Sequence, residues 1–209
     1  MIFGLALLFQ LVFIFVLSLA LAIIGSLIVF FIKSKRKGRL YLFAFHAPFF
    51  ACFTFYFFSL VAALYIGEHY DVDSGIGDVW YVPLAKDSRL LSIDLPGIAS
   101  IERGGKVIVD DVVLLCQKDS LVFGKTDGNA YFILKGDSLV YPQGEAALLS
   151  YNEGKPINWS PIEPFYQERR SAIAGRAETV ALLLCVLISA GVVWVLKLII
   201  LRKGRAATT

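Results

Sequence analysis

The sequence predicts a membrane protein with three transmembrane α-helices and a small antiparallel β-rich extracytoplasmic domain between helices 2 and 3. Three observations predict this fold class. Hydrophobic residues make up 57% of the 209 positions, whereas a soluble domain has about 45–50%. Three long segments are almost free of charged residues. All 17 acidic residues lie between Glu68 and Glu178, which separates one polar domain from the apolar segments.

Each apolar segment is long enough to cross a bilayer, which takes about 20 residues at about 1.5 Å of rise per residue. We assign residues 1–33, 40–67 and 179–201 to transmembrane helices, the last interrupted only by Lys197. They should be helical because a backbone in lipid must satisfy its own hydrogen bonds. No basic residue precedes the first apolar segment, so we expect it to be retained and not cleaved as a signal peptide.

The basic residues predict the orientation, because loops rich in Lys and Arg stay on the cytoplasmic side. Residues 34–39, with Lys33, form a basic loop that holds five positive charges, and the tail 202–209 is also basic. Both are expected to be cytoplasmic. The N-terminus then lies outside, as does the segment 68–178, which holds 17 acidic and 11 basic residues. We expect a multi-pass protein of the cell membrane, the inner membrane of a bacterium.

Residues 68–155 are predicted to form the β-rich domain, because short apolar or alternating runs recur about every ten residues between turn-forming residues. Short links favour an antiparallel meander, folded as a small sandwich or a partly rolled sheet. Val112–Cys116 is apolar on both faces, so this strand is either central or covered by the membrane, a helix or a second copy. The predicted strands are Val79–Leu84, Arg89–Leu95, Ile98–Ile101, Lys106–Val109, Val112–Cys116, Leu121–Gly124, Ala130–Leu134 and Leu139–Tyr141.

Residues 156–178 differ in character from the domain before them. Pro156, Pro161 and Pro164 favour a linker, since proline interrupts helices and central strands. From Tyr166 onward the segment is charged and free of proline. We expect a juxtamembrane helix there, running into the third span.

His46 is the main titratable side chain in the second span, and intramembrane ionisable residues are frequently functional. The structural interpretation is a neutral imidazole bonded to a carbonyl freed by Pro48 or to Gln10, and we favour it. The aromatic side chains of the same span either face acyl chains and neighbouring helices or line a groove for a lipid or a quinone.

No catalytic residue, cofactor-binding residue or metal ligand is predicted. The stretch Asp71–Asp78 resembles a calcium loop but has Ile76 and Val82 where an EF-hand needs Gly and Glu. The three cysteines, Cys52, Cys116 and Cys185, lack the spacing of a zinc site. The basic loop is explained by topology and anionic lipid head groups, so we expect no nucleic-acid partner.

The stretch Gly77–Leu84, followed by Leu91–Asp94, resembles a pattern in bacterial integral membrane proteins that have no assigned activity. In that group an aromatic-rich Y-x-P-L strand precedes an I-D strand in an extracytoplasmic domain. Tyr131–Leu134 and Phe165–Arg169 are similar to later parts of the same pattern. The resemblance covers roughly residues 77–170 and implies an architecture and a bacterial source. It transfers no functional residue.

These observations lead us to expect a non-catalytic protein whose domain mediates protein interaction in the cell envelope. Its expected partners are the lipid bilayer and either an envelope protein or a second copy. Trp80, Tyr81, Tyr131 and Phe132 are the candidate contact residues, although core packing is an alternative for most of them.

Two other functions stay open. One is an accessory subunit of a membrane transport complex, for which His46 is the best residue. The other is a membrane enzyme acting on lipid or envelope polymer. The second would require His69 and the nearby acidic residues Asp71, Asp73 and Asp78 to converge.

Overall fold

The computed structural model describes residues 2–76, 78–84, 87–93 and 97–202. The chain divides into two compact units. The first combines Met1–Tyr65 with Ala177–Thr209, and the second is Ile66–Arg176. Each unit is described in turn.

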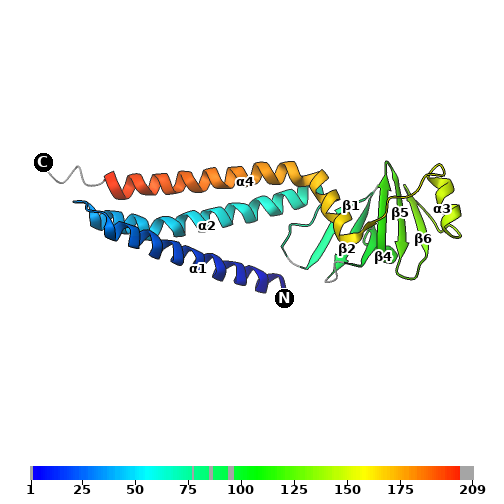
Figure 1. The fold of residues 1–209 in the computed structure, drawn as a ribbon, viewed down its shortest axis with the longest axis horizontal. Helices are drawn as coiled ribbons and strands as arrows, with labels where there is room; N and C mark the ends of the chain where they lie inside the picture. Colours follow the sequence, from blue (N-terminus) through cyan, green and yellow to red (C-terminus); the bar gives the residue numbers. More distant parts are fainter. Residues whose placement is uncertain (1, 77, 85–86, 94–96, 203–209) are drawn as a thin grey trace. The chain divides into compact units, whose positions relative to one another are not determined.

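The first unit is built from three long helices, α1 (Ile2–Phe31) and parts of α2 (Lys37–Tyr70) and α4 (Ile162–Arg202) (Figure 1). All three contain segments long and apolar enough to cross a membrane. In their most apolar stretches only 17%, 6% and 11% of the residues, respectively, are buried. A soluble protein would cover such helices. The predicted presence of three potential membrane-spanning helices is therefore confirmed.

Small residues allow α1 and α2 to approach each other. Ser18 and Ala22 of α1 are fully buried. A Cβ atom added to Gly25 would lie 3.3 Å from the carbonyl oxygen of Ala44. Pro48 has no N–H to donate to that carbonyl. The missing side chain of Gly25 thus lets α1 pass close to the one helical carbonyl that proline leaves without its usual partner.

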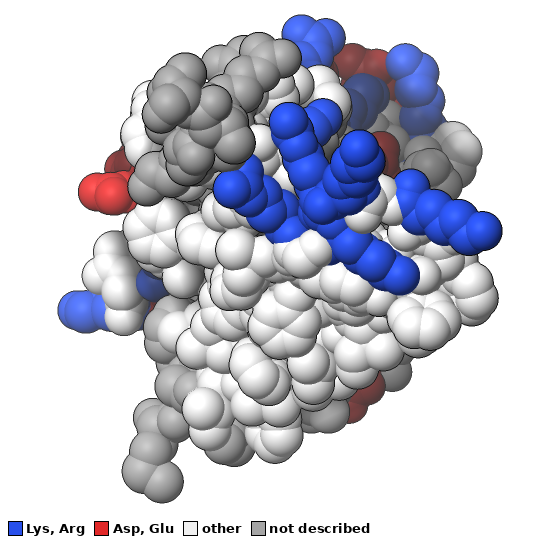
Figure 2. All heavy atoms as spheres, turned by 90° about the vertical axis from the view of Figure 1, so that its left-hand side faces the viewer, with Lys and Arg blue, Asp and Glu red and all other residues white. Residues whose placement is uncertain are grey.

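The connection between α1 and α2 carries the basic loop. Lys37 donates a hydrogen bond from Nζ to the carbonyl of Phe30 at 2.8 Å, and its ammonium lies 5.0 Å from the centre of the Phe30 ring. This arrangement places a positive charge at the C-terminus of α1, where the helix dipole favours it. Lys33, Lys35 and Arg36 are exposed, and Figure 2 shows basic side chains gathered among residues that carry no charged side chain.

The second unit is built on one antiparallel sheet whose strands β1 to β7 lie side by side in chain order (Figure 1). The predicted antiparallel meander is confirmed. The described strands form a single sheet, so of the two expected forms the sandwich was wrong, and the partly rolled sheet stays a prediction. The short helix α3 (Glu145–Tyr151) precedes β8, so the third potential span is the fourth helix in the chain. The strands are β1 Val79–Pro83, β2 Ser88–Ile93, β3 Ala99–Arg103, β4 Lys106–Lys118, β5 Leu121–Thr126, β6 Tyr131–Lys135, β7 Ser138–Val140 and β8 Ser160–Pro161.

Strand β4 joins two segments that the sequence predicts as separate strands. Its first half pairs with β3 and its second half with β5, and Val112 is paired with both neighbours. Asp111 has a positive φ of 54°, and register shifts mark a bulge beside it. Two adjacent exposed aspartates suggest a turn in the sequence, but a bulge absorbs them without ending the strand. Leu115 is fully buried, in agreement with a central strand.

Both faces of β5 and β6 are covered. On one face, Phe123 and Ile133 form a buried cluster with Leu148 of α3. On the other face, Phe132 is fully buried and its ring occupies the space beside Gly124, where an added Cβ would lie 1.9 Å from a ring carbon. Glycine is required here because the ring replaces its side chain.

Helix α4 begins at Ile162, earlier than expected from the prolines. Pro161 lies in the two-residue strand β8, and Pro164 lies in the first turn of α4. The first N–H groups of a helix have no acceptor within the helix, so proline costs little there. The linker predicted for this region is therefore partly strand and partly helix.

Candidate functional site

A groove of about 690 Å³ in the second unit is the candidate site. Its walls are the end of β4, the segment 155–158 with Ser160, and the first turns of α4. Strand β8 pairs with β4 only at Leu114 and Leu115. Beyond these two residues, the end of β4 and the segment that precedes β8 line opposite sides of the groove. The edge of β4 over Cys116–Lys118 therefore has no partner strand on this side among the strands the structure describes.

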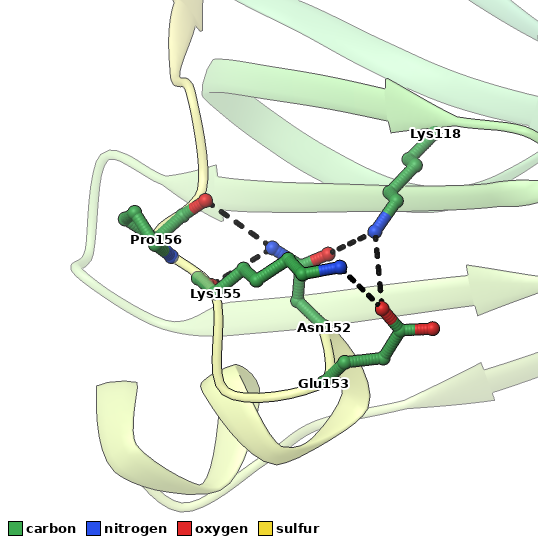
Figure 3. A network of polar contacts seen from close by, with 5 residues as sticks. All are labelled: Lys118, Asn152, Glu153, Lys155 and Pro156. Atoms are coloured by element: carbon green, nitrogen blue, oxygen red, sulfur yellow. Dashed lines mark hydrogen bonds and ion pairs between the residues drawn. The ribbon is translucent and has the colours of Figure 1, made fainter.

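Asn152 organises one wall of the groove (Figure 3). The side chain is buried, at 6% exposure. Its Nδ2 donates to the carbonyls of Lys155 at 2.9 Å and Pro156 at 3.2 Å. Its Oδ1 accepts from Nζ of Lys118 at 3.1 Å. One amide thus shapes the turn after α3 and fixes the ammonium of Lys118.

Glu153 completes this network on the rim. Its Oε2 lies 2.8 Å from Nζ of Lys155 and 4.0 Å from Nζ of Lys118 (Figure 3). The hydrogen bond from Lys155, and next the charge of Lys118, lower the pKa of Glu153. Because these groups are exposed, the ion pairs add little stability. Their effect is to place fixed charges around the opening.

The interior of the groove offers hydrogen-bonding groups but no activated nucleophile. Burial raises the pKa of the Cys116 thiol, against smaller opposing effects of the Asn158 backbone N–H and Lys118. The thiol is therefore protonated at neutral pH and is a poor nucleophile. Oε1 of Gln117 is buried and has no hydrogen-bond partner within the described part of the chain, so the wall presents an unused acceptor.

A second polar cluster surrounds Asp73, which is 3% exposed. The hydroxyl of Tyr166 donates to Oδ1 of Asp73, and Nε of Arg170 lies 3.5 Å from the same oxygen. The backbone N–H of Gly75 donates to Oδ2 at 2.9 Å. Trp80 stacks on Tyr166, with ring centres 5.8 Å apart. Every carboxylate oxygen is occupied, so the cluster fastens the chain after α2 to the start of α4.

Arg169 makes a neighbouring attachment between α4 and the sheet. Its Nε donates to the carbonyl of Pro83 at 3.1 Å, and Nη2 donates to that of Leu84 at 2.9 Å. Burial lowers the pKa of Arg169. Since Arg169 also lines the groove, the same side chain fixes β1 and contributes positive charge to the site.

The four candidate contact residues do not form one surface. Trp80 and Tyr81 are half-buried on β1, and the guanidinium of Arg89 lies 5.2 Å from the Tyr81 ring. Tyr131 is half-buried on β6, five strands from β1 in the sheet order. Phe132 is fully buried against Gly124 and presents no contact surface.

Contacts explain the half-buried aromatic residues. Tyr131 packs on Trp159, with ring centres 6.2 Å apart. Burial raises the pKa of Tyr81, as do the charges of Asp71 and Asp73 to a smaller extent. These side chains join elements of the sheet unit, which is the packing alternative stated above.

His46 has a different hydrogen-bond partner from the two expected. Its Nδ1 lies 2.8 Å from the carbonyl oxygen of Leu42, one turn earlier in α2, so the nitrogen donates. Gln10 instead accepts from the hydroxyl of Tyr56 at 3.1 Å. The Nδ1 atom of His46 thus finds its partner within its own helix.

The residues that a membrane enzyme would need do not converge on a metal site. Among the described residues there is no group of three or more His, Cys, Asp or Glu side chains placed to hold an ion. Asp73 faces Tyr166 and Arg170, as described above, whereas Asp71 and Asp78 are exposed.

The groove itself was not found from the sequence. Lys118 and Asn152 are 34 positions apart, and no local motif connects them. Several sequence features lie near the groove, among them the apolar segment Val112–Cys116, Pro156 and the turn Lys118-Asp119-Ser120. None of them indicates which segment forms the opposite wall.

No family model, curated protein or solved structure matches this chain. The class of this protein is therefore described by its architecture alone. It has three helices long and apolar enough to cross a membrane and an antiparallel sheet domain with a polar groove. The resemblance over residues 77–170 stays a prediction.

Proposed function

We propose that this chain is a multi-pass, non-catalytic protein of a bacterial cell membrane, and that its sheet domain lies outside the cytoplasm and binds an envelope protein through the groove beside β4. The single observation that carries the proposal is the edge of β4 over Cys116–Lys118, which lines the groove and has no partner strand there among the described strands. Exposed strand edges recognise extended polypeptide segments through backbone hydrogen bonds.

The chemistry of the groove supports a polypeptide ligand. Basic side chains, Lys118, Lys155 and Arg169, line the same opening as the acidic residues Asp119 and Glu168. A surface of mixed charge suits a peptide segment that carries both acidic and basic residues. The free acceptor of Gln117 suits a donor such as a backbone N–H. The protonated Cys116 thiol argues against covalent chemistry.

The distribution of charge supports the orientation. The five basic residues between α1 and α2 lie within a short loop, where the positive-inside rule applies most strongly. The sheet unit lies between α2 and α4, so an odd number of crossings separates it from that loop if both helices span the bilayer.

The orientation is tested with a single engineered thiol. Gly128 is exposed and has no positive φ, and an added Cβ would meet the Thr126 hydroxyl at an ordinary contact distance of 3.9 Å, so Gly128→Cys is tolerated. In a background without the three native cysteines, a membrane-impermeant maleimide should label residue 128 in intact spheroplasts. Labelling that requires lysis would place the domain in the cytoplasm and overturn the proposal.

The groove is tested by photo-crosslinking in native membranes. A photoreactive amino acid at Lys155, exposed on the groove wall, should capture a specific protein. The same amino acid at Lys106, the exposed first residue of β4, is the matched control and should not. Gln117→Leu combined with Lys118→Ala should remove the adduct at position 155. Equal adducts at both positions, or an adduct unaffected by the double substitution, would contradict binding in the groove.

A further inference from the structure

We infer that the cleft between α1, α2 and α4 binds one anionic phospholipid from the surrounding bilayer. The cleft lies within the first unit and has a volume of about 780 Å³, in the range of about 300–1,000 Å³ typical of ligand sites. The inference rests on the proposed insertion of the three helices into a membrane. It does not depend on the partner of the sheet domain.

The cleft follows one face of α4. Val186, Ser189, Val193 and Lys197 line it at spacings of three and four residues, which places them on the same helix face. From Val186 to Lys197 the helix rises about 16 Å, close to half of a hydrocarbon core about 30 Å thick. The wall is therefore about as deep as one leaflet, and it is suited to an acyl chain lying along the helix.

Lys197 supplies the charge that selects the lipid. It is the single charged residue among those lining the cleft. The first unit contains one carboxylate, Glu178, about 28 Å from Lys197 along the helix axis. Glu178 is therefore too far along the helix to pair with the ammonium of Lys197. Charges at membrane depth are normally paired, and a phosphate of the adjacent leaflet provides the missing negative charge.

Ser189 indicates that the ligand also carries a hydrogen-bond acceptor. Its side chain is 7% exposed and Oγ has no hydrogen-bond partner within the described part of the chain. Ser189 lies about two turns before Lys197 on the same face of α4, and both residues line the cleft. A phospholipid presents ester carbonyls beside its phosphate.

Native mass spectrometry of the full chain in a non-ionic detergent tests this inference. The protein is titrated separately with phosphatidylglycerol and with phosphatidylcholine of identical acyl chains. We expect one phosphatidylglycerol to bind about fivefold more tightly than phosphatidylcholine, the effect of one basic residue at a membrane surface. Lys197→Gln should abolish this preference. Lys35→Gln, in the exposed basic loop, is the matched control and should retain it.

A cleft-filling substitution locates the acyl chain. Ala190→Phe, on the α4 wall, should weaken binding of both lipids while Lys197→Gln weakens only the anionic one. Equal affinity of the wild type for both lipids would overturn the inference, and so would loss of the preference in Lys35→Gln in place of Lys197→Gln. These outcomes leave the crosslinking result at position 155 unaffected, so the two proposals fail independently.

Discussion

The hydroxyl of Tyr166 donates a hydrogen bond to the carboxylate of Asp73, although the two residues are 93 positions apart in the chain. Asp73 follows α2 and Tyr166 lies in the second turn of α4. The carboxylate is buried, and Arg170 and the N–H of Gly75 complete its partners. The ends of the sheet unit are thus joined by a buried charge, which is stable only while its partners stay in place.

Removing the Tyr166 hydroxyl should therefore destabilise the sheet unit. Tyr166→Phe keeps the ring that stacks on Trp80 but removes a hydrogen bond to a charged group, worth about 1.5–3 kcal/mol. We expect the free energy of unfolding to fall by about that amount, measured by pulse proteolysis of the full chain in urea. Tyr151→Phe, at an exposed position, is the control. An equal effect at both positions would show that the contact to Asp73 is not stabilising.

A second prediction concerns the contact between Gly124 and Phe132. Gly124→Ala places a methyl group inside the Phe132 ring, and overpacking of this severity should cost about 3 kcal/mol or more. Gly97→Ala, where an added Cβ meets nothing within 4 Å, should be nearly neutral. The measurement is the urea midpoint of the sheet unit.

The same pair can be tested by a double-mutant cycle. Phe132→Leu alone should destabilise, but combined with Gly124→Ala it should cost less than the sum of the single changes, by more than about 1 kcal/mol. Additive effects would indicate that the ring and the methyl group do not compete for the same space.

The parts of the fold that depend on short-range patterns were predicted from the sequence. Long uncharged segments fix the three helices, and alternating runs between turn residues fix the meander. The point at which a strand ends was harder to predict. Asp110 and Asp111 resemble a turn, yet the chain continues through them as β4, because neighbouring strands on both sides hold the backbone extended across the bulge.

The candidate site could not be predicted because its residues meet only through tertiary structure. Lys118 reaches Asn152 after the meander and α3 bring the end of β4 beside the turn that follows Tyr151. The same reason explains why Phe132 was predicted as a contact residue although it is fully buried. In a strand with one wet face an aromatic residue can be exposed, but here both faces of β6 are covered, and nothing in the sequence of the strand shows the second cover.

Alkylation of Cys116 should show a pH dependence shifted to alkaline values. Burial raises its pKa above the ordinary thiol value of about 8.5, so the folded state favours the neutral thiol. The resulting stabilisation is complete below that ordinary value and is lost as pH rises through the higher folded pKa. In a background lacking Cys52 and Cys185, iodoacetamide should react with Cys116 only at higher pH than with an exposed thiol at Gly128→Cys. If the two thiols reacted with the same pH profile, burial would not raise the pKa of Cys116.

The basic loop gives the last prediction, on orientation. If its positive charge keeps the loop between α1 and α2 on the cytoplasmic side, replacing its five basic residues with glutamine should leave a fraction of the molecules in the membrane with the opposite orientation. Labelling of Gly128→Cys by an impermeant maleimide on intact spheroplasts should then decrease. The matched control neutralises five lysines of the sheet unit that lie outside the roughly 15–20 residues next to a predicted span, the range in which charges set orientation: Lys106, Lys118, Lys125, Lys135 and Lys155. The positive-inside rule counts charges by their distance from a span, so the same charge change in the two places must have different effects. A decrease in labelling in the control, or none in the loop variant, would show that the loop does not set the orientation of the chain.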